Sequence, residues 1–121
     1  MSRAVCIVDD DASVRKSLGN LLRSAGFECL AFATGEVFLA SNLAHEAGCL
    51  LLDLKMPGIN GLDVQRELVR RGSLLPVICM SAHWDERALQ AALHNGARGC
   101  LGKPFSEEVL LKAVEEALAG E

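Results

Sequence analysis

The segment CLLLD at residues 49–53 places four consecutive apolar residues, 49–52, directly before the carboxylate of Asp53. Four further short and mostly apolar runs lie at residues 4–8, 28–32, 76–80 and 98–101. Runs of this length and composition are typical of parallel strands that are covered on both faces. The pattern therefore predicts five buried parallel strands.

Helical patterns separate the apolar runs. After the first run, an apolar stripe recurs at i, i+4, i+7, i+8 and i+11, formed by Val14, Leu18, Leu21, Leu22 and Ala25. Asp11 can cap the start of this helix, and Gly26 can end it. Further helices are expected after Thr34, over residues 61–71 and 85–95, and from Ser106 onward. This alternation predicts an α/β fold, a (βα)5 doubly wound open sheet with helices on both faces.

Length and composition limit the alternatives. The 121 residues are expected to form a single domain, residues 1–121, without an effector domain in this chain. The net charge of −4 disfavours direct binding of nucleic acid. No apolar run approaches the roughly 20 residues that a membrane span needs, and acidic residues come too early for a signal peptide. We therefore expect a cytoplasmic protein that does not bind a membrane.

The cysteines and histidines give no sign of a metal or disulfide framework. The five cysteines are odd in number and form no CxxC pair, so they are expected to be reduced and buried. The histidines show no HExxH or i,i+4 spacing and are expected at the surface; they are His45, His83 and His94.

Polar or charged residues follow four of the five apolar runs. These residues are Asp9, Asp10 and Asp11, then Asp53, Ser81 and Lys103. In an open α/β sheet the ligand site lies beyond the carboxyl ends of the strands. Clustered carboxylates repel one another unless a cation offsets them, and hard oxygen ligands suit Mg²⁺. We therefore expect a Mg²⁺ site at this edge, with a solvated helix N-cap as the simpler alternative for residues 9–11.

The same residues carry a family resemblance that spans the chain. The matching pieces, in order, are Val8-Asp9-Asp10, LDLKMPG at 52–58 with Gly61, Met80-Ser81-Ala82, Gly96-Ala97 and Lys103-Pro104-Phe105. Together they resemble the receiver domain of two-component response regulators. The stretch VRKSL at residues 14–18, with Gly26-Phe27 and Phe38-Leu39, further resembles the FixJ-like class. The resemblance implies the flavodoxin-like strand order 2-1-3-4-5.

The resemblance also implies a phosphoryl acceptor and a metal site. Asp53 would accept a phosphoryl group from a phosphohistidine of a sensor histidine kinase. Asp10 and Asp53 would contact Mg²⁺ directly, Asp9 would contact it through water, and the backbone carbonyl of Lys55 would be a further ligand.

Two other side chains would contact the phosphoryl group. Ser81 would donate its hydroxyl, and Lys103 would pair with another oxygen, with a cis peptide bond before Pro104. Phosphorylation would control an output, which in this class is transcription through an attached or separate DNA-binding domain. A phosphorylation-dependent homodimer is a further expectation of the same resemblance.

The sequence departs from the family pattern at two positions. Serine stands at position 81, where threonine is frequent, and it keeps the hydroxyl. Cys100 stands three residues before Lys103, where the family usually has tyrosine or phenylalanine. Without that ring, we expect the switch to run through the loop after the fourth strand, from Ser81 through His83 to Trp84.

Other functions fit the sequence less well. Asp9-Asp10-Asp11-Ala12-Ser13 resembles the DxDx[TV] motif of haloacid-dehalogenase-type phosphatases, which also bind Mg²⁺ but use the first aspartate as nucleophile. That family usually has a longer chain and an acidic pair after its fourth strand. A receiver-like interaction module that is not phosphorylated is a second alternative. No phosphate-binding GxxxxGK[ST] or GxGxxG motif occurs.

Overall fold

The computed structural model describes residues 4–42 and 46–119. One parallel sheet has the strand order β2-β1-β3-β4-β5, which confirms the predicted topology. The strands are β1 (Ala4–Val8), β2 (Glu28–Phe32), β3 (Cys49–Asp53), β4 (Val77–Ser81) and β5 (Gly99–Gly102). The first two match their predicted ranges, and the others differ from them by one residue at one or both ends.

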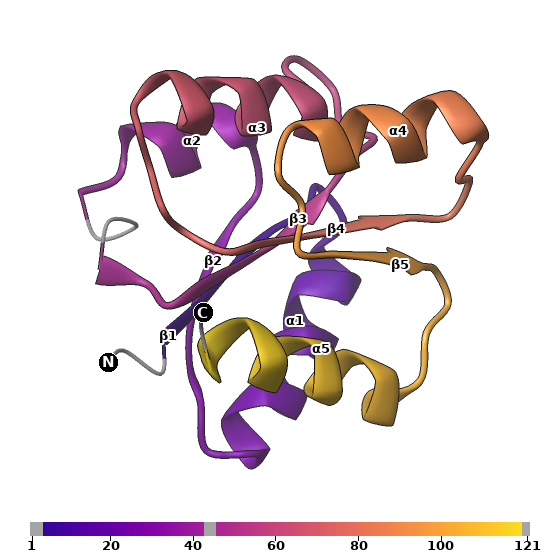
Figure 1. The fold of residues 1–121 in the computed structure, drawn as a ribbon. Helices are drawn as coiled ribbons and strands as arrows, with labels where there is room; N and C mark the ends of the chain where they lie inside the picture. The colour runs from indigo at the N-terminus through magenta and orange to yellow at the C-terminus, as the bar shows by residue number, and fades with distance from the viewer. Residues whose placement is uncertain (1–3, 43–45, 120–121) are drawn as a thin grey trace.

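Five α-helices of the described residues cover the two faces of the sheet. They are α1 (Ala12–Ser24), α2 (Gly35–Ala40), α3 (Gly61–Arg70), α4 (Glu86–His94) and α5 (Glu107–Ala119). Helices α1 and α5 lie on one face, and α2, α3 and α4 lie on the other (Figure 1). This three-layer arrangement is the predicted doubly wound fold.

The strand sequences explain the two cores. Successive side chains of a strand point to opposite faces, so Val5 and Ile7 of β1 pack with α1 and α5, whereas Cys6 and Val8 pack on the other face. Every residue of β3 is buried. A strand covered on both faces must be apolar throughout, which accounts for the uninterrupted run that precedes Asp53.

Side-chain caps set where the helices begin. The Asp11 carboxylate accepts hydrogen bonds from the amides of Ser13 and Val14 at the start of α1. Thr34 caps α2, and Asp85 caps α4. Each cap satisfies a backbone amide that has no partner within its helix. After α1 the chain turns at Gly26, whose positive φ of 93° is accessible to glycine.

The cysteines match their expected burial only in part: Cys6, Cys49 and Cys79 are buried, whereas Cys29 and Cys100 are half-buried. All five cysteines are free, and burial raises the pKa of the Cys49 and Cys79 thiols to about 12. His83 and His94 are exposed, and His45 lies outside the described residues. Among residues 4–42 and 46–119, no helix is both long enough and apolar enough to cross a membrane.

The strand register brings the predicted site residues to one edge. Val8 pairs with Leu52, and Ser81 pairs with Gly102. Asp9 therefore follows the end of β1, Asp53 and Ser81 end β3 and β4, and Lys103 follows the end of β5, all at the same edge.

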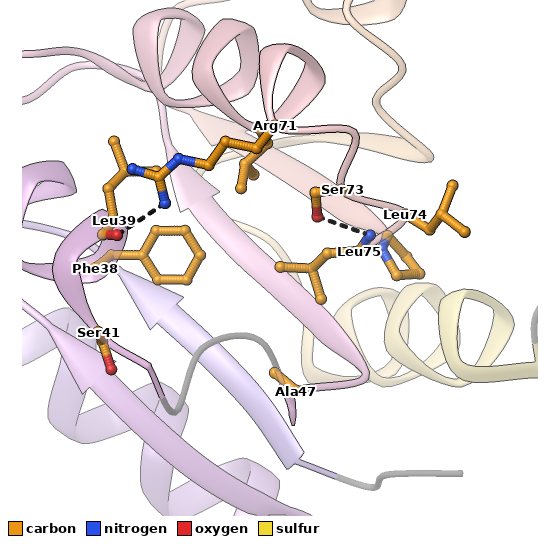
Figure 2. A pocket seen from close by; sticks show the side chains of 10 residues that line it. Phe38, Leu39, Ser41, Ala47, Arg71, Ser73, Leu74 and Leu75 are labelled. Carbon is orange, nitrogen blue, oxygen red and sulfur yellow. Dashed lines mark hydrogen bonds between the residues drawn. The ribbon is translucent and has the colours of Figure 1, made fainter.

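The opposite edge carries a different feature. A hollow lies between α2, the end of α3 and residues 73–76 (Figure 2). Its lining includes Phe38, Leu39 and Leu75, and Arg71 donates a hydrogen bond to the Leu39 carbonyl across it at 2.9 Å. Among the described residues, Arg71 is the only charged residue of this lining, which therefore contains no carboxylate.

Candidate functional site

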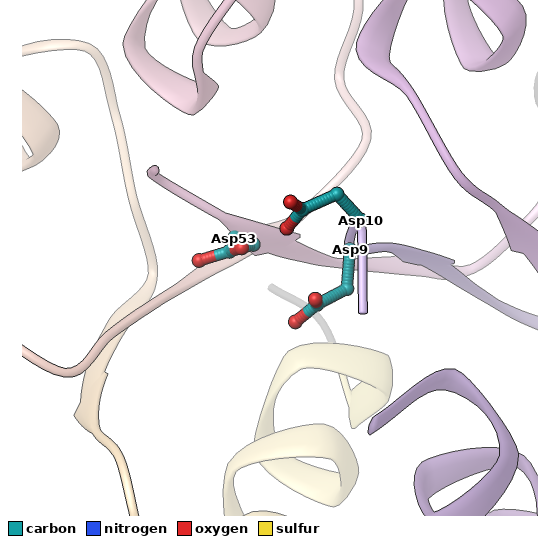
Figure 3. A group of neighbouring side chains, drawn as sticks. All are labelled: Asp9, Asp10 and Asp53. Atoms are coloured by element: carbon teal, nitrogen blue, oxygen red, sulfur yellow. The ribbon is translucent and has the colours of Figure 1, made fainter. Parts of the chain in front are cut away.

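Three carboxylates converge where β1 and β3 end. Asp9, Asp10 and Asp53 each offer a carboxylate oxygen, and these oxygens lie within 4.8 Å of one another (Figure 3). Asp9 is fully buried, Asp53 is 5% exposed and Asp10 is exposed. The structure therefore brings together the three side chains that the sequence placed at these strand ends.

Lys103 brings a positive charge to this cluster from the end of β5. Its Nζ atom lies 2.8 Å from Asp9 Oδ2 and 3.5 Å from Asp53 Oδ1. Burial opposes the charge on the ammonium, but the hydrogen bond to Asp9 and the charges of Asp53 and Asp9 outweigh it, so the pKa of Lys103 is raised. The Lys103–Pro104 peptide bond is cis, as the resemblance implied.

The environment of Asp53 raises the pKa of its carboxyl above that of a solvated aspartate. Burial and the negative charge of Asp9 raise the pKa of this carboxyl from 3.8 to about 6, although Lys103 and the Lys55 amide favour the anion. The Lys55 amide donates to Asp53 Oδ1 at 3.4 Å. At neutral pH the carboxylate is therefore mostly ionised but poorly solvated, so an added cation can stabilise it strongly.

Gly61 packs against the backbone beside Asp53. A Cβ atom at this position would lie 2.6 Å from the Asp53 carbonyl oxygen and 2.8 Å from the Leu54 Cα atom. The Gly61 amide also donates to the Leu54 carbonyl at 3.0 Å. Both neighbours are backbone atoms, so only glycine lets α3 begin this close to the end of β3.

Ser81 lies at the end of β4 and is 1% exposed. Its hydroxyl accepts a hydrogen bond from the His83 amide at 3.1 Å and can donate to the His83 carbonyl at 3.2 Å. Its own carbonyl accepts from the Lys103 amide at 2.8 Å. Ser81 is therefore joined through its backbone to Lys103 and through its side chain to the loop before α4.

The other predicted switch residues lie on the α4 side of β5. Trp84 donates its indole N–H to the Leu101 carbonyl at 2.9 Å, and its Cδ1 atom lies 3.9 Å from where a Cβ of Gly102 would stand. Trp84 and Cys100 both pack against the core under α2, α3 and α4. An indole thus lies on β5 on the side where Cys100 offers only a small side chain.

Arg15 lies off the apolar stripe of α1, and the sequence pattern assigned it no role. In the structure Arg15 is half-buried, and its Nη1 atom donates to the Asp9 carbonyl at 2.7 Å. Helical periodicity gives the face on which a side chain lies but not the loop carbonyl that a long side chain reaches.

This arrangement suits a small set of reactions. A buried carboxylate beside an ammonium can act as a nucleophile toward a centre whose developing negative charge the ammonium stabilises. The neighbouring oxygens form a hard donor set. The described cluster therefore offers a carboxylate that can act as a nucleophile, an ammonium beside it and a hard donor set that can hold a cation.

Comparison with known proteins agrees with the geometry. The family model for the response regulator receiver domain matches residues 5–115. Nodulation protein W of Bradyrhizobium diazoefficiens is 42% identical over 113 residues, which are 93% of this chain and 50% of that protein. The transcriptional regulatory protein FixJ of Azorhizobium caulinodans is 37% identical over 117 residues, which are 97% of this chain and 56% of that protein. The chain thus spans about half the length of these curated relatives.

A solved structure shows the same fold over the whole chain. The crystal structure titled FixJ-N superposes with a TM-score of 0.89 at 33% identity and covers 100% of this chain and 97% of that one. The family match covers nearly all of the sequence and includes each strand end that carries Asp9, Asp53, Ser81 and Lys103. From its sequence, its fold and these matches, the chain belongs to the response regulator receiver domains and, within them, to the FixJ-like class.

Proposed function

We propose that Asp53 accepts a phosphoryl group from a phosphohistidine of a sensor histidine kinase. The observation that carries the proposal is the placement of the Asp53 carboxylate, 5% exposed and 3.5 Å from Lys103 Nζ, beside the acidic pair at the end of β1. In the transfer a bond forms between an Asp53 oxygen and phosphorus. The bond from phosphorus to the histidine nitrogen breaks, and its electron pair stays on the imidazole.

Lys103 and Ser81 would act on the oxygens of the transferred group. Lys103 already faces Asp53, so its ammonium can neutralise phosphoryl charge without first moving toward the site. Ser81 must first release the His83 backbone. A hydrogen bond to a charged phosphoryl oxygen is stronger than one to a neutral carbonyl, which gives the hydroxyl a reason to leave its present partners.

The donor set fits Mg²⁺. Asp9, Asp10 and Asp53 offer carboxylate oxygens, and the Lys55 carbonyl is a further ligand by family resemblance. The cation would neutralise charge on the carboxylates and on the phosphoryl oxygens. Lys103 neutralises only part of the charge of three carboxylates, so an empty cluster keeps unfavourable repulsion that a divalent cation removes.

The output is proposed from the class. Phosphorylation would change the loop after β4 and the start of α4, and so regulate transcription through a DNA-binding domain, attached or separate. The domain itself would not contact DNA. A phosphorylation-dependent homodimer through α4 and β5 is part of this proposal, and Leu93 on α4 is 47% exposed. We also propose that the protein is cytoplasmic.

Chemical trapping tests the assignment of Asp53. The protein is incubated with acetyl phosphate and Mg²⁺, reduced with borohydride and mapped by mass spectrometry. We expect label on Asp53, none in Asp53→Asn and normal label in Asp11→Asn, a nearby carboxylate whose capping role asparagine can keep. Label on Asp9 would instead support a phosphatase-type nucleophile, and no label on folded protein would support an interaction module.

Sedimentation tests the dimer separately. With Mg²⁺ and the phosphoryl mimic beryllofluoride, the protein that carries beryllofluoride should sediment as a dimer at tens of micromolar, on the order of the affinity of a transient interface. Leu93→Ser should weaken association without changing label on Asp53. If protein that is fully occupied by beryllofluoride stays a monomer, then the dimer is removed from the proposal. The proposed role of Asp53 as acceptor is then unaffected.

A further inference from the structure

The end of the ladder between β1 and β2 leaves the Asp9 carbonyl needing a donor. The pairing runs to Val8 and Phe32, and the Asp9 amide still donates to the Phe32 carbonyl at 3.2 Å. In a longer parallel ladder the Asp9 carbonyl would accept from the amide of residue 34. Thr34 instead begins the turn into α2 as its N-cap. Asp9 is fully buried, so an unpaired carbonyl here would be costly.

Arg15 supplies the missing donor from the second turn of α1. Its Nη1 atom lies 2.7 Å from the Asp9 carbonyl oxygen, a short distance that fits a charge-assisted hydrogen bond. The Arg15 side chain makes no other hydrogen bond or ion pair in the described part of the chain. A single contact therefore explains why this long side chain turns back toward the sheet edge.

The contact acts on a segment that carries two of the three clustered carboxylates. Asp9 accepts from Lys103 Nζ at Oδ2 and from the Asp11 amide at Oδ1, at 2.8 and 2.9 Å. Those bonds orient its side chain, whereas Arg15 and the Phe32 carbonyl hold its backbone. Asp10 follows directly on Asp9 (Figure 3) and its side chain is exposed, so its position depends on how firmly the Asp9 backbone is fixed.

We propose that Arg15 is a positioning residue of the cation site, one that holds the segment from Asp9 to Asp11 in place and thereby strengthens binding of a divalent cation. The inference rests on the proposed function, because it takes Mg²⁺ as the ligand. Residues that orient metal ligands from behind commonly change affinity by about 10-fold or more when removed.

Two possible roles of Arg15, as a positive charge and as an anchor, predict opposite changes in the Kd for Mg²⁺ when its guanidinium is removed. If the guanidinium acted only as a positive charge near three carboxylates, then its removal would lower the Kd for Mg²⁺. If it acts as an anchor, then its removal frees the segment and raises the Kd. Arg15→Met removes both the charge and the donors while keeping an unbranched side chain. Lys16→Met is the matched control, because Lys16 is an exposed cation at the next position of α1.

The experiment has two readouts on the metal-free chain of 121 residues. Calorimetric titration with Mg²⁺ should give a Kd about 10-fold higher for Arg15→Met, an unchanged or slightly lower Kd for Lys16→Met and an intermediate Kd for Arg15→Lys, which keeps one charged donor. Native-state hydrogen exchange should be faster at the Asp11 amide in Arg15→Met and unchanged in Lys16→Met. The lysine variant decides the question if the methionine variant does not fold.

The two readouts separate failure of the inference from failure of the proposed function. An unchanged or lower Kd in Arg15→Met would overturn the anchor. If the wild-type protein binds no Mg²⁺, then the proposed metal is wrong, and exchange at Asp11 still decides whether Arg15 holds the segment. Unchanged exchange there would overturn the inference by itself.

Discussion

The hydroxyl of Ser81 is hydrogen-bonded to the backbone of His83, whose amide nitrogen and carbonyl oxygen lie 3.1 and 3.2 Å from Ser81 Oγ. Trp84 follows directly, and its indole N–H is held by the Leu101 carbonyl at 2.9 Å. Drawing Ser81 toward a phosphoryl group at Asp53 would break the first contact and pull on the second. The loop before α4 and its first turn would then be the element with two arrangements.

This chain of contacts predicts a spectroscopic change. Trp84 is the only tryptophan and the sequence has no tyrosine, so emission reports this loop alone. Adding beryllofluoride with Mg²⁺ should change the emission of Trp84, and Ser81→Ala should reduce the change while Asp53 still accepts label. Ser73→Ala is the matched control, because among the described residues the Ser73 hydroxyl bonds only the local Leu75 amide, at the opposite edge (Figure 2). An unaltered spectrum at full modification would exclude the loop as the relay.

Lys103 should affect metal binding and phosphoryl uptake in opposite directions. Lys103→Met removes the ammonium that bonds Asp9 and faces Asp53, so a cation that competes with Mg²⁺ is lost. We expect a lower Kd for Mg²⁺ but phosphorylation by acetyl phosphate that is slower by at least about 10-fold, because a preorganised positive charge at the transferred group is gone.

The same variant should also lose stability. Breaking a largely buried ion pair leaves Asp9 without its cation, which lowers the free energy of unfolding by about 1–3 kcal/mol after allowing for the partial exposure of Lys103. Lys112→Met, a surface lysine on α5, should change none of the three measurements. Weaker Mg²⁺ binding in Lys103→Met would contradict the competition between the two cations.

Asp53 should destabilise the metal-free protein in a pH-dependent way. Burial and the charge of Asp9 raise its pKa to about 6, whereas an aspartate in an unfolded chain titrates near pH 3.9. Between these values the folded state binds more protons than the unfolded state, so the free energy of unfolding falls as the pH rises and stays lower at neutral pH. Asp53→Asn should therefore be more stable than wild type by about 1–2 kcal/mol at pH 7.5.

Denaturant unfolding at several pH values, without metal, tests the direction of this effect on the free energy of unfolding. The advantage of Asp53→Asn should shrink as the pH falls from 6 to 4, because the wild-type carboxyl then gains its proton. A difference that does not vary with pH would mean that packing, and not charge, separates the two proteins.

Strand ends could be predicted from this sequence because short apolar runs mark them. Parallel pairing then forces Asp9, Asp53, Ser81 and Lys103 to one edge, whatever the details of the loops. The roles of Arg15 and Gln65 could not be predicted in this way. Each is a long polar side chain whose partner is a backbone carbonyl in another element, and hydrophobic periodicity contains no information about that partner. The bond from Trp84 to Leu101 likewise depends on the path of a loop.

Gln65 lies in α3 and is 1% exposed. Its Nε2 atom donates to the Ala92 carbonyl of α4 at 3.1 Å, but its Oε1 atom has no hydrogen-bond partner among residues 4–42 and 46–119. The Ala92 carbonyl also accepts from the Ala97 amide at 3.0 Å, so it would stay satisfied without Gln65. The side chain therefore brings a desolvated acceptor into the core in return for one bond that its partner does not need.

Replacing Gln65 by methionine should leave the protein as stable or raise its free energy of unfolding by up to about 1 kcal/mol. Methionine keeps the length and most of the volume of the side chain, and it removes a buried oxygen whose desolvation costs about 1–3 kcal/mol, against about 1 kcal/mol for the lost hydrogen bond. Gln65→Ala is the control for packing and should destabilise, because it opens a cavity between α3 and α4. Urea unfolding of the three proteins in metal-free buffer measures both effects. The expectation is contradicted if the free energy of unfolding of Gln65→Met falls by more than about 1 kcal/mol. That result would show that Oε1 has a partner in solution, for instance a buried water, and that the hydrogen bond to α4 stabilises the protein by more than about 1 kcal/mol.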